Sequence, residues 1–385
     1  MMTNYQNHYF CLPNLDLMKI AKGSIRFSRK DKQQFLSTLN KRVNAYFKDN
    51  NLRKTGNWKL HLKTVILVTL FITPYVLLLS LDLSEWIKLG LCVLLGFGMA
   101  GIGMNVMHEG NHGSYSRYGW VNKIMGGAIY ILAGNVFNWK VQHNVLHHSF
   151  TNIYGHDEDL EAGTVMRFSK HAKWRAIHRF QHLYFIILYG LMTLRWVITT
   201  DFIQLKKYLK LNLSYKKKTS PTIEWLVLVL SKTFYVALWI VLPMLVLDLA
   251  WWKILIGFVA MHYTAGTILS VVFQLAHITT NTDMPLPSTT GSMKNTWAIH
   301  QLFTTGNFAP KNSFINWFTG GLNHQIEHHI FPYISHIHYK NIGKIVKKTA
   351  REFDLPYNEF KTFGAAFYSH YKLLKSLAKK PNPAT

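Results

Sequence analysis

Histidine is concentrated in three short stretches of this chain, and the spacing within them suits metal binding. The stretches read HEGNH (108–112), HNVLHH (143–148) and HQIEHH (324–329), and a further histidine ends an apolar run at position 277. Histidines four residues apart lie on one face of a helix, close enough to share one ion. The candidate ligands are His108, His112, His143, His147, His148, His277, His328 and His329.

Eight imidazoles are more than one metal ion needs. A tetrahedral zinc site takes four ligands, so eight histidines could hold two ions and leave positions open for oxygen. Imidazole serves zinc, copper, iron and nickel, and the ligand type alone leaves the metal open. Because neutral imidazoles do not compensate the charge of the ions, we expect carboxylates nearby. Asp157 and Asp159 follow the second stretch, and Glu109 and Glu327 lie inside the first and third.

The remaining histidines lie outside these stretches, and we expect structural roles for most of them. His262 lies midway along an apolar run and is expected to pack there, whereas the role of His300 stays open. Histidines in basic or polar segments are expected to cap helix ends or to extend toward a membrane interface. They are His8, His61, His171, His178, His182, His336, His338 and His370.

Apolar segments long enough to cross a membrane must position these side chains. A transmembrane helix needs about 20 apolar residues. Four stretches meet this requirement, and spans are expected at 64–81, 89–107, 225–247 and 254–275. A fifth apolar stretch, 183–198, is short and contains Arg195, and the stretch 124–137 has the length of an interfacial or re-entrant segment. We therefore predict an all-α integral membrane protein with about four transmembrane helices, interfacial helices and a His-rich cytoplasmic cap.

The distribution of positive charge predicts the orientation. The net charge is +25, and residues 19–63 hold 13 Lys and Arg while residues 167–218 hold 12. Basic segments beside spans stay on the cytoplasmic side, so four spans place both termini and all the histidine clusters there. A nucleic-acid binder is excluded, because its basic residues would form a stripe interleaved with base-stacking aromatics.

The three histidine stretches resemble the histidine boxes of the integral-membrane fatty acid desaturases. HEGNH is similar to the first box, HNVLHH to the second and QIEHH (325–329) to the third. A glutamine at the start of the third box resembles the front-end subgroup, which inserts a double bond between an existing one and the carboxyl end, for example Δ6 on a linoleoyl substrate. The likeness covers roughly residues 60–340 and includes GGLNHQIEHHIFP and QHNVLHHSFTN.

The resemblance implies a function and roles for individual residues. It implies an oxygen-dependent acyl desaturase with two iron ions as cofactors and O2 as co-substrate. The box histidines and His277 would bind iron, and Gln325 would be an indirect ligand or support them. Independently of the resemblance, Asp157 is the carboxylate that we expect to support the ligands. Gln325 stands where many members have a histidine ligand, and the adjacent His324 could take that role instead. We expect the acyl channel to pass near Trp139.

The expected partners follow from the same resemblance. They are the lipid bilayer, a fatty acyl substrate carried by coenzyme A or by a lipid, and an electron donor. Many eukaryotic front-end members carry a fused cytochrome b5 domain with an HPGG motif, which the first 60 residues do not contain. We therefore expect a separate ferredoxin or cytochrome b5-type donor, which the basic face would attract.

We expect the chain to consist of three parts, and two alternative functions stay open. Residues 1–63 are expected to form a basic cytoplasmic segment, 64–345 the membrane domain with the two-metal site, and 346–385 a cytoplasmic tail. A di-iron lipid hydroxylase would use the same boxes. A His-rich metal transporter would instead place ionisable residues near the bilayer midplane.

Overall fold

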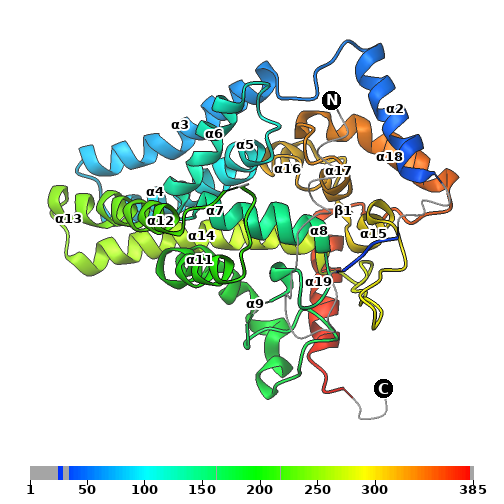
Figure 1. The fold of residues 1–385 in the computed structure, drawn as a ribbon. Helices are drawn as coiled ribbons and strands as arrows, with labels where there is room; N and C mark the ends of the chain where they lie inside the picture. Colours follow the sequence, from blue (N-terminus) through cyan, green and yellow to red (C-terminus); the bar gives the residue numbers. More distant parts are fainter. Residues whose placement is uncertain (1–24, 29–33, 162, 217, 382–385) are drawn as a thin grey trace.

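The computed structural model of the chain describes residues 25–28, 34–161, 163–216 and 218–381. Four long apolar helical segments dominate it (Figure 1). Each is long and apolar enough to cross a membrane, which confirms the predicted all-α membrane fold. The segments are Trp58–Ser80 (α3), Glu85–His112, Pro221–Val246 and Trp251–His277 (α14).

The second and third segments are interrupted by wider π-helical turns. The second consists of α4 (Glu85–Ile102), the π-helical turn Gly103–Met107 and α5 (His108–His112). The third consists of α12 (Pro221–Val236), the π-helical turn Ala237–Val241 and α13 (Leu242–Val246). A π turn contains one residue more than an α turn and is frequent at functional sites.

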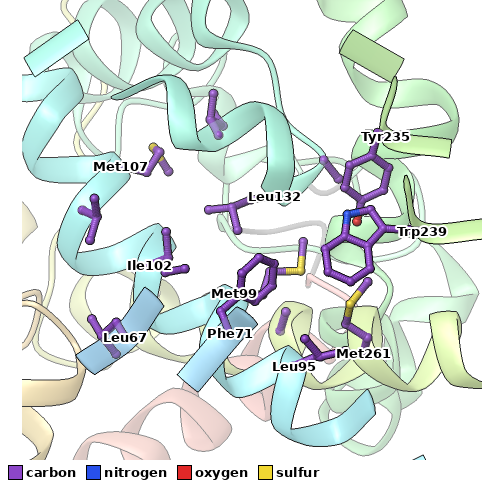
Figure 2. Packing of buried hydrophobic residues seen from close by; sticks show 14 of the residues in the cluster. Leu67, Phe71, Leu95, Met99, Ile102, Met107, Leu132, Tyr235, Trp239 and Met261 are labelled. Carbon is purple, nitrogen blue, oxygen red and sulfur yellow. The ribbon is translucent and has the colours of Figure 1, made fainter. Parts of the chain in front are cut away.

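Helix α4 packs against both α3 and α14 through small residues. A Cβ at Gly96 would lie 2.5 Å from the Met261 carbonyl oxygen, and one at Gly98 would lie 2.9 Å from the Phe71 Cα. Only glycine therefore permits these close helix contacts. Large apolar side chains fill the space around them, among them Phe71, Leu95, Met99, Trp239 and Met261 (Figure 2).

The fifth apolar stretch lies in a bent helical pair. The helix axis bends by 60° between Ala176–Gly190 and Met192–Lys210, as in a broken span or a re-entrant loop. Length and composition therefore allow four or five spans. The pair is built from a 3-10 turn, a π-helical turn and three α-helices. They are Ala176–Phe180, Trp196–Thr200, α9 (Gln181–Gly190), α10 (Met192–Arg195) and α11 (Asp201–Lys210).

The stretch 124–137 forms short helical pieces rather than one helix. They are α6 (Gly119–Gly127), the 3-10 turn Ala128–Leu132 and α7 (Val136–Trp139). Ala133, with φ +75°, separates the last two. Lys232 of α12 donates to the carbonyl oxygens of Ala133 and Trp196 and pairs with the Asp201 carboxylate at 2.5 Å. This buried lysine ties the short pieces to the bent pair.

The remaining elements form a cap at the end of α14 that carries His277 (Figure 1). The second histidine stretch lies on the π-helical segment Lys140–His147 and on α8 (His148–Phe150). Single 3-10 turns are Glu158–Leu160 and His336–His338. The helices of the cap are α2 (Phe35–Asp49), α15 (Trp297–Thr304), α16 (Ser313–Phe318), α17 (Gln325–Ile330), α18 (Tyr339–Glu352) and α19 (Phe363–Leu377).

Two parallel strands of two residues each, β1 (Asn307–Phe308) and β2 (Glu359–Phe360), are the only strands in the described part of the chain. An apolar core joins α2 and α15 to the third histidine stretch on α17 and to α18. Residues of the C-terminal third are thus packed around the metal-ligand candidates.

Candidate metal centre

The structure brings all eight candidate ligands together from four separate parts of the chain. The end of the second span supplies the first two histidines, the segment after α7 supplies three, the last residue of α14 supplies one and α17 supplies two. Seven of these side chains are buried, and His112 is partly buried. They form two adjacent groups, which we call site A and site B.

Site A consists of His108, His112, His143, His148 and His328. Ring nitrogens of four of them, all except His148, lie within 4.8 Å of one another. The Nε2 atom of His148 lies 3.3 Å from that of His143 and 3.1 Å from that of His328. The five nitrogens therefore converge on one small volume.

Site B consists of His147, His277 and His329, whose ligand atoms also lie within 4.8 Å of one another. The buried Nε2 atom of each ring has no hydrogen-bond partner. Unpaired buried polar atoms are costly and rare. Three of them turned toward one another fit a bound cation.

The other nitrogen of each site B ring faces an acceptor. The Nδ1 atom of His147 lies 3.1 Å from both carboxylate oxygens of Asp157, and that of His329 lies 2.9 Å from the side-chain oxygen of Gln301. The Nδ1 atom of His277 lies 3.4 Å from the Thr304 carbonyl oxygen. A proton on Nδ1 leaves the Nε2 lone pair free, which is the tautomer that a metal ligand needs.

Burial keeps most of these histidines neutral. It lowers the pKa values of His143, His148, His328 and His329 well below the ordinary value, and neighbouring histidines lower them further. His147 differs, because burial would lower its pKa but the carboxylates at 157 and 159 outweigh burial and raise it. The carboxylates expected near the metals thus lie next to one ligand, His147, on the side of its Nδ1 atom.

The carboxylates near the boxes have different roles. Glu109 accepts hydrogen bonds from His336 and Ser114, and Glu327 accepts from Asn307 and Tyr357, so neither pairs with a candidate ligand. Asp159 lies with His143 and His147 in a third group of possible metal ligands. Burial raises the pKa of Asp159 to about 7, against the opposing effect of His147.

Gln325 and His324 differ in what they face. Gln325 is buried, lies beside His277 and has a side-chain oxygen without a hydrogen-bond partner. His324 is also buried, but its Nδ1 atom lies 3.6 Å from Glu327 and it belongs to neither site. The geometry thus favours Gln325 over His324 as the residue that completes site B.

Several of the other histidines correct the sequence-based expectation. His336, His338 and His370 were expected at helix caps or at an interface, but all three are buried. His336 lies 2.8 Å from Lys63 Nζ and also bonds to Glu109, and His370 bonds to Tyr189 and to the Ile278 carbonyl. The hydrogen-bond partners of His336 and His370 come from segments distant in the sequence.

Among the remaining histidines, His178 caps a helix and His262 packs within a span, as expected, and His300 has a structural partner. His178 caps the helical turn that starts after Arg175. His262 packs in α14 with hydrogen-bond distances to Tyr235 and Thr193, and His300 faces the Thr151 carbonyl. His61 is exposed, and His171 and His182 are partly buried. His8 lies outside the described residues.

A cavity of about 770 Å³ adjoins the centre. Trp139 lines it, as predicted, and stacks on His143 with ring centroids 4.4 Å apart. His108 and Gln325 form part of its wall. Away from the histidines the wall is mostly apolar and includes Gly103, Met104, Leu132, Leu188, Met192 and Leu269. Such a cavity suits a long apolar molecule with one part beside site A.

Three supporting residues could not be recognised in the sequence. Gln301, Thr304 and Tyr339 each lie at hydrogen-bonding distance from a candidate ligand, and the Tyr339 hydroxyl is 3.2 Å from His328 Nδ1. No motif marks them. Gln301 and Thr304 are three residues apart and lie on the same face of α15. This spacing points to the metal centre only once α15 is known to pack against α17, which carries two of the ligands.

Comparisons with known proteins agree with this geometry. A family model described as "Fatty acid desaturase" matches residues 84–361. A protein named sn-1 linoleoyl-lipid 6-desaturase from Arthrospira platensis is 35% identical over 350 residues, 90% of this chain and 93% of that relative. One of the same name from Synechocystis sp. is 34% identical over 92% of this chain and 98% of its own length. An acyl-lipid (8-3)-desaturase from Physcomitrium patens is 32% identical over 93% of this chain and 75% of its own length.

Proposed function

The chain belongs to the fatty acid desaturase family and is an acyl desaturase, and we propose that it acts on a linoleoyl-type chain of a membrane lipid. The new cis double bond would lie on the carboxyl side of the existing ones. Two similar relatives carry names that specify a linoleoyl-lipid substrate and position 6. The observation that carries the proposal is the largely apolar cavity that runs past His108 and His143.

The eight clustered histidines would hold two iron ions. Bound iron would supply the reduction of O2 that removes two hydrogens from the acyl chain, with two further electrons and two protons, to give the alkene and two waters. The support is the chemistry of the donor set, since neutral imidazole is a suitable iron ligand and the Nε2 atoms of site B have no other partner.

The chain's own residues would orient the ligands and the substrate. Asp157, Gln301 and Thr304 would fix the ring orientation in site B through Nδ1. Trp139 and the apolar wall would hold one pair of methylenes beside site A and exclude water. Gln325, at the cavity wall beside His277, would complete site B.

Electrons would come from a separate acidic protein of the ferredoxin or cytochrome b5 type. Helix α18 packs against α17, which carries His328 and His329, and its outer face is basic. Exposed cations on this face attract an acidic partner. They are Lys340, Lys344, Lys348 and Arg351.

We also propose that the metal centre and both termini lie on the cytoplasmic side. Residues 1–63 would form the basic N-terminal segment, residues 64–345 the membrane domain and residues 346–385 the C-terminal tail. The support is the 13 Lys and Arg of residues 19–63, which precede the first span in the sequence, and the 12 of residues 167–218, which precede the third. Accessibility of a cysteine introduced at Ser376 to an impermeant reagent in sealed spheroplasts would test the orientation.

The function is tested by mass spectrometry of fatty acids from a host that expresses the chain, is fed linoleate and supplies a compatible donor. We expect a product that has lost two hydrogens, with the new bond on the carboxyl side. A regiospecific lipase then identifies the carrier lipid and position. A product that has gained one oxygen would instead identify the lipid hydroxylase. An unchanged profile, with iron and reduced donor present, would refute the proposal.

A further inference from the structure

The two sites differ in what lies behind their ligands. In site B, each of the three rings has an acceptor at Nδ1, and one acceptor is the carboxylate of Asp157. In site A, the hydrogen bond recorded behind a ring is that between His328 and the neutral Tyr339 hydroxyl, while the buried Nδ1 of His148 has no partner. Within the described residues, no carboxylate forms an ion pair with a site A histidine, and the carboxylate that comes near one is Asp159, within 4.8 Å of His143.

Asp157 is held in place independently of any ligand. Its side chain is 1% exposed and accepts hydrogen bonds from the backbone amides of Asn152 at 2.8 Å and Asp159 at 3.0 Å. The carboxylate therefore faces His147 whether or not an ion is present. A carboxylate behind a histidine ligand makes the ring more basic and fixes its tautomer, and removal of such a partner typically lowers metal affinity by about 10- to 100-fold.

The sites also differ in their relation to the cavity. His108 and His143 of site A line the cavity wall, whereas the three histidines of site B do not. His147, His277 and His329 are each at most 1% exposed. Site A thus offers five imidazoles, two of which line the cavity, and site B offers three imidazoles that do not line it, one of them backed by carboxylates.

We propose that the two ion sites are inequivalent: site B is a tight site that fills first, and site A is a weaker, cavity-facing site that fills second. A fifth imidazole gives site A an additional donor but no charge, whereas Asp157 compensates part of the charge of the site B ion. This inference rests on the proposal that these histidines bind metal, and it does not depend on which acyl chain is the substrate.

The test is a metal titration of the full-length protein in detergent after chelator treatment, with Co²⁺ as the probe and no substrate. Competition with a chelator of known affinity gives the dissociation constants, and visible absorption reports the ligand set. We expect two classes of site whose dissociation constants differ by at least about tenfold. A single class of equivalent sites would refute the inference.

Two matched variants assign the classes. Asp157→Asn removes one of the two carboxylates behind His147, since a carboxylate oxygen of Asp159 lies 3.2 Å from the same Nδ1 atom. It is expected to weaken the tight class by about 10- to 100-fold and to leave the weak class unchanged. Tyr339→Phe removes the hydroxyl behind His328 and is expected to weaken only the weak class. If both variants weaken the same class, or if Asp157→Asn affects only the weak one, the assignment is wrong.

A third variant covers a failure of Asp157→Asn to fold, which circular dichroism would reveal. Gln301→Leu removes the acceptor of His329 and is expected to weaken the tight class as well. A protein that binds no metal at either site would refute the metal proposal as a whole. Two classes of site in a protein that does not desaturate linoleate would leave the inference standing and refute the proposed substrate.

Discussion

The cavity beside site A can be filled from the protein side at Gly103. This glycine begins the π-helical turn Gly103–Met107 and lines the cavity. A Cβ at this position would lie 3.6 Å from Leu269 Cδ2 and 3.8 Å from Leu132 Cδ1, which are ordinary contact distances. Alanine therefore fits without displacement, and a larger side chain must occupy space that we assign to the acyl chain.

The expected loss can be worked out from the carbon atoms added. Burial of one methylene contributes about 0.8 kcal/mol, and about 1.4 kcal/mol corresponds to tenfold in rate. Gly103→Ala adds one carbon, which its neighbours accommodate at contact distance, and is expected to lower kcat/KM by no more than about fourfold. Gly103→Leu adds four carbons, equivalent to about 3 kcal/mol and a loss of about 200-fold. A shorter acyl chain should lose less, because it fills less of the cavity.

The assay is conversion of acyl lipids of graded chain length by membranes that contain equal amounts of each variant. Gly90→Leu is the matched control, since a Cβ at Gly90 meets nothing within 4 Å and this position does not line the cavity. It should retain activity. Wild-type activity in a folded Gly103→Leu protein, or an equal loss in Gly90→Leu, would refute the assignment of the cavity to the substrate.

Three further predictions concern single residues. His147→Ala should abolish desaturation while the protein still inserts, whereas His61→Ala at the surface should not; normal product from the former would refute the ligand assignment. Gln325→Ala should lower the cobalt affinity of site B, while Gln325→His should preserve it, as measured by chelator competition. Lys232→Met leaves Asp201 buried without its cation and should lower the free energy of unfolding by about 3–5 kcal/mol. The double variant with Asp201→Asn should recover part of this loss, and a Lys232→Met protein that melts at the wild-type temperature would contradict the prediction.

Composition and spacing were sufficient for the spans and for the ligand candidates. The span ends differ from the prediction mainly because helices continue past the apolar run. The second span was expected to end at Met107 but continues through His112, since HEGNH stays helical. The convergence of the clusters could be anticipated because hydropathy and charge place all of them at the same end of the helices.

The residues behind the ligands could not be predicted, because they are set by packing between distant segments. Gln301 reaches His329 only because α15 lies beside α17, and Lys63 reaches His336 across more than 270 residues. His336 and His338 alternate with Ser335, Ile337 and Tyr339, a pattern that does not reveal which of these side chains is buried. Periodicity reports the face of a helix that is buried, but not the neighbour that covers it.

The π-helical segment Lys140–His147 has a consequence for how this protein can change over evolution. Each residue of an α-helix turns the chain by about 100°, so deletion of one residue from this segment would restore α-helical winding and rotate the ligands on its two sides relative to each other by about that angle. The ligands that follow the deletion would then point away from their partner histidines on α14 and α17. Substitutions between the histidines can therefore accumulate one at a time, whereas a change in the length of the segment would disrupt both sites.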